Sequence, residues 1–322
     1  MINIGSGNIQ AIKVGTDDYI KAYQGSTLVW SAENPVTALT CYYHVTQTGT
    51  TTIGNAITSG TSTMIVDGVS VPASTTFNFT TTGNHVVEWV DVISSLPMNA
   101  FAGVTALTEV EFPETVHQIN YYAFSGCTNL VSADMTVCTS LAINAGAFWD
   151  CALLREIQLG PVSRIHDDLF NGCVGVSSEV LIIPETVSSI GNRSFQNLGC
   201  NGHIGINLTF PSGITSVGHM AFENSRVTYF GLNDGLLTIG NYAFARTGPP
   251  DMDIPSSVTS IGTGAFEDVS CQSVRFLGTT PPTFGDDVFQ YAPLFDGIRV
   301  PEASIEAYKA ALPQYVDKIV GY

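Results

Sequence analysis

Six histidines are the side chains best suited to acid–base or metal chemistry in this 322-residue chain. They are dispersed, and no His-Glu-x-x-His pattern, Gly-x-Ser-x-Gly motif or phosphate-binding loop accompanies them: His44, His85, His117, His166, His203 and His219. An active site needs a nucleophile, a base or a set of metal ligands that converge on one place. The sequence therefore predicts a protein that is not an enzyme and uses no cofactor.

Three pairs of adjacent aspartates offer a second kind of chemistry, because clustered carboxylates suit a hard cation such as Ca²⁺. The pairs are Asp17–Asp18, Asp167–Asp168 and Asp286–Asp287. Two of the pairs stand at the same position before a phenylalanine that recurs along the chain. This shared position favours solvated turn residues over metal ligands, and calcium binding is the alternative interpretation.

Aromatic side chains at turn positions are better candidates for a binding site. The position after the recurring phenylalanine carries Trp149 in the third copy, whereas it is small or polar in the others: Ala102, Ser125, Asn171, Gln196, Glu223, Ala245, Glu267 and Gln290. Flat aromatic faces stack on sugar rings or pack into protein partners. The alternative is that Trp149 packs against a neighbouring turn, since single surface aromatics are common.

Five further residues complete the predicted binding set. Tyr122 and Tyr242 lie two residues before a recurring phenylalanine, at a position that holds Asn99, Asp168 or Asp287 in other copies, so we expect them to point outward. The remaining three stand at strand positions where the side chain can face solvent: Arg155, Tyr229 and Arg275.

The elements that must position these side chains form a repeat. An apolar residue precedes a phenylalanine by five positions in nine copies, whose phenylalanines are spaced 22 to 27 residues apart: Phe101, Phe124, Phe148, Phe170, Phe195, Phe222, Phe244, Phe266 and Phe289. Each copy indicates a strand, a turn, a second extended piece and a short turn that carries the phenylalanine. A unit of this size cannot bury its own apolar rows, so neighbouring units must stack into a solenoid.

The pattern Pro-x-x-Val-x-x-Ile-Gly-x-x-Ala-Phe, with a cysteine three residues after several of the phenylalanines, closely resembles the BspA-like leucine-rich repeat family over about 210 residues. The resemblance implies a right-handed solenoid with a parallel sheet on one side, and adhesion through its surface instead of catalysis. Three departures from the pattern are expected to bend the solenoid or mark a contact: the 125–147 copy without its proline turn, Phe284 in place of an aliphatic residue, and the insertion at residues 199–202.

Flanking segments divide the chain further. Residues 1–31 alternate apolar and polar side chains and resemble a short N-terminal β module of surface and tail proteins from bacteriophages of gut bacteria. Residues 32–90 predict a small β-sandwich similar to immunoglobulin-like adhesin modules. The repeats occupy residues 91–300. Residues 301–322 predict a capping helix, framed by two prolines and with an apolar face made by Ile305, Tyr308 and Leu312. The expected fold class is therefore mostly β.

Seven cysteines form no Cys-x-x-Cys pair. Cys127, Cys151 and Cys173 each follow a recurring phenylalanine by three residues, where other copies carry Val104, Leu198, Val269 or Ala292. Because valine and leucine replace them freely, we predict buried small apolar residues, not disulfides or metal ligands.

The net charge and the targeting signals limit the classes of partner that the protein can have. Twenty-eight acidic residues against 11 basic ones give a net charge of -17, which excludes phosphate-backbone binding, and no apolar run suits a membrane span. No export signal begins the chain. We therefore expect a virion surface protein of a phage that attaches through residues 1–31 to other virion proteins and binds a bacterial surface glycan or protein through the repeats. The alternatives are a bacterial cell-surface or secreted adhesin, and a purely structural virion protein.

Overall fold

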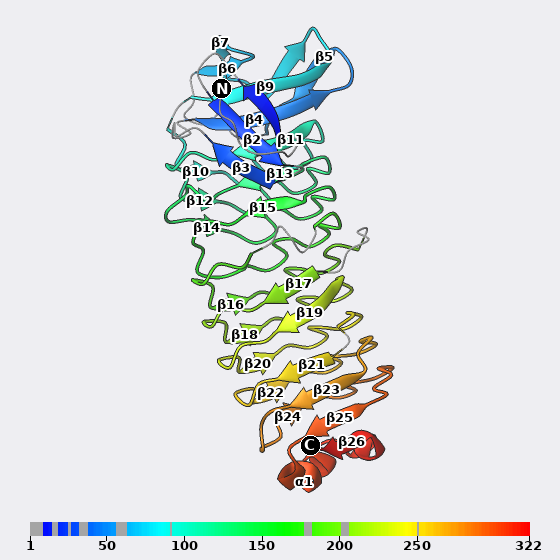
Figure 1. The fold of residues 1–322 in the computed structure, drawn as a ribbon. Coiled ribbons are helices and arrows are strands. Elements are labelled where there is room, and N and C mark those ends of the chain that lie inside the picture. The colour runs from blue at the N-terminus through cyan, green and yellow to red at the C-terminus, as the bar shows by residue number, and fades with distance from the viewer. Residues whose placement is uncertain are drawn as a thin grey trace.

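The computed structural model describes residues 9–14, 19–24, 27–31, 38–55, 63–90, 92–176, 182–200, 206–249 and 251–322. The fold is mostly β, and Figure 1 shows an elongated solenoid that runs from a group of sheets near the N-terminus to the helix α1 at the other end. The predicted mostly β solenoid with a short C-terminal helix is confirmed.

Two sets of strands precede the repeats. The first is an antiparallel sheet of β1 (Ile9–Val14), β2 (Tyr19–Gln24) and β3 (Thr27–Ser31). The second comprises β4 (Leu39–Val45), β5 (Gly49–Thr52), β6 (Thr63–Val66), β7 (Val69–Pro72), β8 (Thr76–Phe79) and β9 (Gly83–Trp89). In this second set β5 pairs with β8, and β4, β9, β6 and β7 lie side by side in a larger sheet. The immunoglobulin-like assignment of this segment stays a prediction.

The sheet of the second set continues into the solenoid. Strand β4 pairs antiparallel with β11 (Leu107–Glu111), which pairs parallel with β13 (Ser132–Asp134), which in turn pairs with β15 (Glu156–Gln158). The result is one seven-stranded sheet in the order β15-β13-β11-β4-β9-β6-β7. The strand β11 therefore has its backbone groups paired on both sides, so the N-terminal edge of the repeat sheet that contains it is closed.

Two carboxylates flank β4 on this sheet. Thr40 of β4 lies opposite Glu88 of β9 on one side and opposite Glu111 of β11 on the other. Burial, and secondarily the charge of Glu111, raise the pKa of Glu88 above its ordinary value. Ionised Glu88 is therefore disfavoured in the folded state.

Glu88→Gln is expected to stabilise the protein at pH 7 and to have no effect at low pH. The protonated form is favoured in the folded state, so this group's favourable contribution is complete below the pKa of the unfolded chain and is lost as the pH rises through the folded pKa. We expect a Tm increase of roughly 1–2 °C at pH 7, since the group is only partly buried. Thermal unfolding of the parent protein and of Glu88→Gln from acidic pH to pH 7 measures the difference in Tm. An equal increase in Tm at every pH would show that the effect does not come from the charge of Glu88.

The solenoid carries two rows of parallel strands, whereas the family resemblance implied a sheet on one side. The longer strands are β11, β13 and β15, then β17 (Ile206–Thr209), β19 (Val227–Gly231), β21 (Asp251–Ile254), β23 (Ser273–Phe276), β25 (Gly297–Val300) and β26 (Ile319–Gly321). The two-residue strands are β10 (Ser95–Leu96), β12 (Gln118–Ile119), β14 (Ala142–Ile143), β16 (Ser189–Ile190), β18 (Ser216–Val217), β20 (Thr238–Ile239), β22 (Ser260–Ile261) and β24 (Thr283–Phe284). The second row arises because the apolar residue five positions before each phenylalanine also adopts extended backbone.

The short row is interrupted in the middle of the described chain. Among the described residues β14 has no partner strand in the next copy, and a single bridge joins Ile165 to Ile190. In the long row the described pairings end at β15 and begin again at β17, and residues 177–181 and 201–205 between them lie outside the described ranges. The predicted irregularity at residues 199–202 lies partly outside these ranges and stays a prediction.

The repeat phenylalanines form one column through the core. All nine are buried, and neighbouring ring centroids lie 5.0 to 5.7 Å apart in a stacked arrangement. The ring planes of Phe148, Phe170 and Phe195 differ by 17° and 19°, whereas the other neighbours differ by 10° or less. The rings therefore tilt most where the short row is reduced to a single bridge.

A cap closes the C-terminal end. The helix α1 (Ile305–Ala311) lies between the short 3-10 segments η1 (Glu302–Ser304) and η2 (Pro313–Lys318). Tyr308 and Leu312 are buried, and the Tyr308 hydroxyl donates a 2.9 Å hydrogen bond to the carbonyl of Gly278. The predicted apolar face of the helix thus covers the last repeats.

The cysteines confirm the prediction of buried apolar residues. All seven thiols are free, and six are buried. Cys127, Cys151 and Cys173 each donate from Sγ to the carbonyl of the phenylalanine one repeat earlier, at 3.0 to 3.2 Å. The thiols thereby satisfy a backbone acceptor inside the column.

We expect Cys200, the one half-buried cysteine, to react first with a thiol reagent in the native protein at pH 8, and to react slowly because burial raises its pKa as well. Burial raises the pKa of Cys127 and Cys271 to about 12 and that of Cys138 to about 11, so these groups hold little reactive thiolate. A dithionitrobenzoate assay measures the number of reactive thiols. All seven should react in urea, and rapid reaction of several thiols in the native protein would contradict the expectation.

Candidate functional site

The turn that carries each phenylalanine has the same backbone in every repeat. We call the surface made by these turns, from three residues before to three residues after each repeat phenylalanine, the turn ridge. The residues two positions before and two positions after the phenylalanine have φ between 50° and 77° in all nine copies. Residues other than glycine rarely adopt this left-handed conformation, yet the first of the two positions holds Tyr122, Arg193, Met220 and Tyr242.

Hydrogen bonds between neighbouring turns impose this backbone. In the second copy the amides of Tyr122, Phe124 and Gly126 donate to the next turn, to the carbonyls of Ala145, Ala147 and Trp149. The same three bonds join all eight pairs of neighbouring turns, including those next to the single Ile165–Ile190 bridge. The turn ridge is therefore a surface whose backbone is hydrogen-bonded continuously along the solenoid. The Cα atoms of its side chains are held in fixed positions by these bonds.

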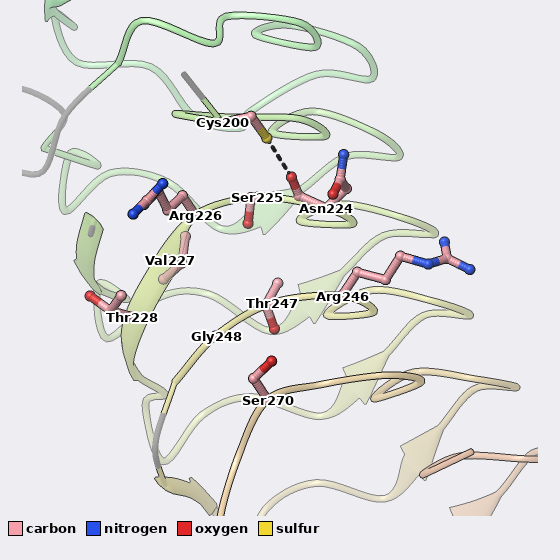
Figure 2. Close-up of a pocket in the computed structure, with 10 residues that line it drawn as sticks. All are labelled: Cys200, Asn224, Ser225, Arg226, Val227, Thr228, Arg246, Thr247, Gly248 and Ser270. Atoms are coloured by element: carbon pink, nitrogen blue, oxygen red, sulfur yellow. Dashed lines mark hydrogen bonds between the residues drawn. The ribbon is translucent and has the colours of Figure 1, made fainter. Parts of the chain in front are cut away.

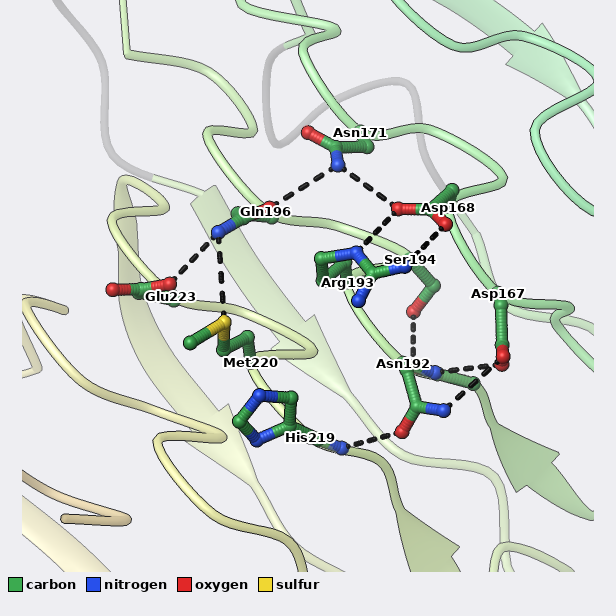
Figure 3. Close-up of polar contacts among 11 residues, drawn as sticks. Asp167, Asp168, Asn171, Asn192, Arg193, Ser194, Gln196, His219, Met220 and Glu223 are labelled. Carbon is green, nitrogen blue, oxygen red and sulfur yellow. Dashed lines mark hydrogen bonds and ion pairs between the residues drawn. The ribbon is translucent and has the colours of Figure 1, made fainter.

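Polar side chains form a chain of contacts along the ridge from Asp168 to Glu223 (Figure 3). Arg193 donates two 2.8 Å hydrogen bonds to the carboxylate of Asp168. Asn171 links Asp168 to Gln196, and Gln196 donates to Glu223 at 2.7 Å. These contacts tie successive repeats together where the short row is joined by the single Ile165–Ile190 bridge.

The aspartates of the Asp167–Asp168 pair serve this network. Asp167 accepts hydrogen bonds from the backbone and side-chain amides of Asn192, whose own oxygen accepts from the amide of His219. Both carboxylates thus have protein donors, as turn residues do. Within the described ranges no group of three potential metal ligands occurs, and Asp17 and Asp18 lie outside those ranges.

Two of the predicted site residues lie together on the ridge. The rings of Tyr122 and Trp149 are 36% and 40% exposed, with centroids 5.9 Å apart and planes inclined by 52°. Tyr121, 45% exposed, adds a third ring next to Tyr122. Sequence reasoning missed Tyr121, although its position holds Met98, Ala145 or Asp167 in neighbouring copies and an aromatic residue is equally out of pattern there.

A glycine fixes the ring of Tyr122. A Cβ on Gly146, at the equivalent position of the next repeat, would lie 2.4 Å from Cε1 of Tyr122, so the ring lies directly over the glycine. Tyr242 has the same arrangement, with its ring over Gly264 and the corresponding distance 2.3 Å. Its partner ring is His219, at 6.0 Å. Tyr242 therefore lies apart from the Tyr122–Trp149 pair.

The other three predicted residues stand elsewhere on the long-strand side. Arg155 is exposed and directly precedes β15, and Tyr229 in β19 is 53% exposed. Arg275 in β23 donates two hydrogen bonds to Asp253 and lies 5.8 Å from the ring of Tyr322. The structure does not bring these side chains together with the aromatic pair.

A shallow groove of about 300 Å³ opens between the turn ridge and the long strands (Figure 2). Arg246 at its rim is paired with Glu223 and Glu267, and Thr247 donates to the carbonyl of Phe244. Burial raises the pKa of Cys200, which also lines the groove. With its cations paired or exposed and its thiol protonated, the groove holds no poised acid, base or nucleophile.

Comparison with known proteins identifies the repeats. The family model described as "BspA type Leucine rich repeat region (6 copies)" matches residues 74–201 and 163–296. A search of curated proteins gave no match. In the part of the chain that the structure describes, no helix is both long and apolar enough to cross a membrane.

Several solved structures are similar in fold. A leucine-rich repeat protein of Bacteroides ovatus is 17% identical to this chain, with a TM-score of 0.34. The match covers 60% of this chain and 66% of that protein, so the chain spans just under two thirds of that protein's length. A leucine-rich cell surface protein of Faecalibacterium prausnitzii is 20% identical, with 71% and 76% of the two chains covered and a TM-score of 0.40. The leucine-rich repeat protein of T. pallidum is 23% identical, with 48% and 70% covered and a TM-score of 0.41. Because the family model covers well over half of its length, the chain belongs to the BspA type leucine-rich repeat family.

Proposed function

We propose that this protein is a non-catalytic adhesion protein that binds a bacterial surface glycan or protein through the turn ridge of its solenoid. The observation that carries this proposal is the exposed pair of Tyr122 and Trp149 on a ridge whose backbone is hydrogen-bonded from the first repeat to the last. Rigid, partly exposed aromatic rings provide contact area at little cost in conformational entropy.

The family and the chemistry of the surface support a binding role. Proteins of this repeat family bind proteins or surface molecules, and no enzyme family matches the chain. The described surface offers paired ions, amides and hydroxyls without a convergent catalytic set. Weak contacts of this kind reach useful strength when many copies of a protein act together, as on a particle or a cell.

The proposal includes a location. Residues 1–31 resemble phage surface modules, so the favoured site is the virion surface, with this module attached to other virion proteins and the repeats displayed toward a bacterial cell. A bacterial cell-surface or secreted adhesin would use the same ridge, and a structural virion protein would use it against other virion components.

Two measurements test the proposal. Fluorescently labelled full-length protein is expected to bind the envelope of gut bacteria, and an antiserum raised against it should decorate phage particles in immunogold electron microscopy of the source culture. Label on bacterial envelopes with bare particles would replace the phage location with the bacterial one. Label on particles combined with no cell binding would favour the structural role.

A further inference from the structure

We infer that the cluster of Tyr121, Tyr122, Trp149 and Asp150 is a binding site for a neutral pyranose unit of a surface glycan. This inference rests on the proposed function and narrows it to one site and one class of ligand. A pyranose ring has an apolar face of C–H groups and a rim of hydroxyls, so it is complementary to aromatic rings bordered by hydrogen-bond acceptors.

The aromatic part of the site is preorganised. The backbone of Tyr122 is held at φ 57° by the bonds of the turn ridge, and its ring lies on Gly146, which has no side chain to displace it. Trp149 extends from the next turn, with its ring inclined by 52° to that of Tyr122, and both residues stay partly exposed. Little conformational entropy is lost on binding to rings that are already fixed.

A carboxylate without a hydrogen-bond donor follows Trp149 in the chain. Asp150 is exposed at the second left-handed position of its turn, with φ 56°. Its Oδ1 lies over Gly172 of the next turn, where a Cβ would be 2.2 Å away, and it has no donor among the residues that the structure describes, whereas Asp167 and Asp168 have theirs. Asp150 therefore has acceptor capacity left for a hydroxyl of a glycan that extends past Trp149 toward the next turn.

The charge around the site favours a neutral ligand. No lysine or arginine occurs between Lys21 and Arg155, so the copies that carry the site supply no cation of their own for a phosphate, sulfate or uronate. Arg193, which interacts electrostatically with Tyr122, is already paired with Asp168. An anionic sugar would therefore meet the carboxylate of Asp150 and a cation whose charge is already compensated.

The size of the site favours a sugar over a folded protein. The neighbouring side chains Asn120 and Asn144 are amides that hydrogen-bond to each other, so polar groups border the three rings. A stable protein interface buries about 800 Å² per partner around a desolvated apolar core. Three rings that are each less than half exposed provide far less apolar area.

The chain contains a matched control for this site. Tyr242 has the same left-handed backbone as Tyr122, φ 55°, and the same glycine beneath its ring. At the position that corresponds to Trp149, the repeat after Tyr242 carries Glu267, which is paired with Arg246. Tyr242→Ala is therefore the matched control for stability, because it removes a ring from the same backbone and the same glycine, beside His219 in place of Trp149.

The test measures binding of the full-length protein to cells of a bacterium that it labels, before and after the cells are treated with periodate or protease. Periodate cleaves the vicinal diols of sugars and should abolish binding, whereas protease should leave it. Trp149→Ala and Tyr122→Ala are each expected to weaken binding about tenfold or more, and Trp149→Phe should restore part of it because a ring is kept. Phe295→Ala, which removes an exposed ring outside the turn ridge, should stay within about twofold of the parent protein. Binding should change little between low and high salt.

Several results would overturn the inference while leaving the proposed function in place. These are cell binding that resists periodate but is lost after protease, binding by Trp149→Ala equal to that of the parent, or equal losses of binding for Tyr122→Ala and Phe295→Ala. Urea unfolding of each variant shows that it is folded. Absence of binding by the parent protein to every envelope tested would overturn the proposed function and the sugar site with it.

Discussion

Phe222→Ala is expected to destabilise the protein by about 3–5 kcal/mol, the cost of removing a fully buried phenylalanine from a close-packed core. Its ring stacks on Phe195 and Phe244, at 5.1 and 5.5 Å, and meets Phe210 and Phe230 at 5.9 and 5.3 Å. A cavity at this point removes contacts on four sides. It also lies between two repeats, and repeat stability depends on the interface between neighbours.

Urea unfolding followed by circular dichroism measures this loss. The matched control is Phe295→Ala, because Phe295 is 80% exposed and its removal should change stability by no more than about 0.5 kcal/mol. Because repeats couple mainly to their neighbours, Phe222→Ala should also broaden the transition or split it in two. A loss of stability no larger than that of Phe295→Ala would show that the phenylalanine column does not hold the repeats together.

Gly218→Ala is expected to destabilise the protein by about 2–3 kcal/mol through overpacking, even though it adds a single methyl group. A Cβ on Gly218 would lie 2.6 Å from the backbone carbonyl carbon of Gly191 in the preceding repeat. A backbone atom cannot rotate away as the end of a side chain can, so the two repeats must separate. The same close approach recurs at Gly240, Gly262 and Gly285, where a Cβ would lie 2.4 to 2.6 Å from its closest backbone atom.

Gly248→Ala provides the control for this second variant. The nearest atom to a Cβ at Gly248, the carbonyl oxygen of Val227, lies 4.0 Å away, and no left-handed φ constrains this glycine. The substitution should therefore be neutral, or stabilising by about 0.4–1 kcal/mol through the lower entropy of the unfolded chain. Thermal and urea unfolding of both variants measure the difference. Equal effects at Gly218 and Gly248 would contradict a role for close backbone approach.

The repeat register and the phenylalanine column could be predicted from the sequence, because burial places the same residue type at the same point of each copy. The backbone of the turn ridge could not. The position two before the phenylalanine holds Asn99, Tyr122, Gly146, Arg193 and Met220, residues with different local preferences and a common left-handed conformation. Hydrogen bonds to the next repeat impose that conformation, and a tertiary constraint of this kind leaves no consistent side-chain signal.

The candidate site could also be predicted from the sequence only in part. Trp149 could be singled out because it breaks the pattern of its own row, and Tyr121 could have been found by the same comparison in a different row. The contact between Tyr122 and Trp149 depends on which rows lie side by side in space, and the fixed ring of Tyr122 depends on Gly146 one repeat later. Neither relation is visible from one copy alone. The binding roles of Arg155, Tyr229, Tyr242 and Arg275 stay predictions.

The pairing of β4 with β11 also could not be foreseen, since a boundary between two predicted domains falls between these strands. Strand β4 can pair antiparallel with β11 wherever the free backbone N–H and C=O groups of the two strands face each other. The side chains of a strand do not indicate which of its two backbone edges is paired.

Identical bonding between turns makes the length of this protein an evolvable quantity. Phe222, Phe244 and Phe266 are 22 residues apart, and their turns are joined by the same three hydrogen bonds. Duplication or loss of the gene segment that encodes one such unit would reconnect equivalent partners on both sides and leave β4 and α1 at the ends undisturbed. Each event would change the reach of the molecule by one ring spacing, about 5.5 Å between Phe222 and Phe244, so a lineage could adjust the distance between its two ends in equal steps.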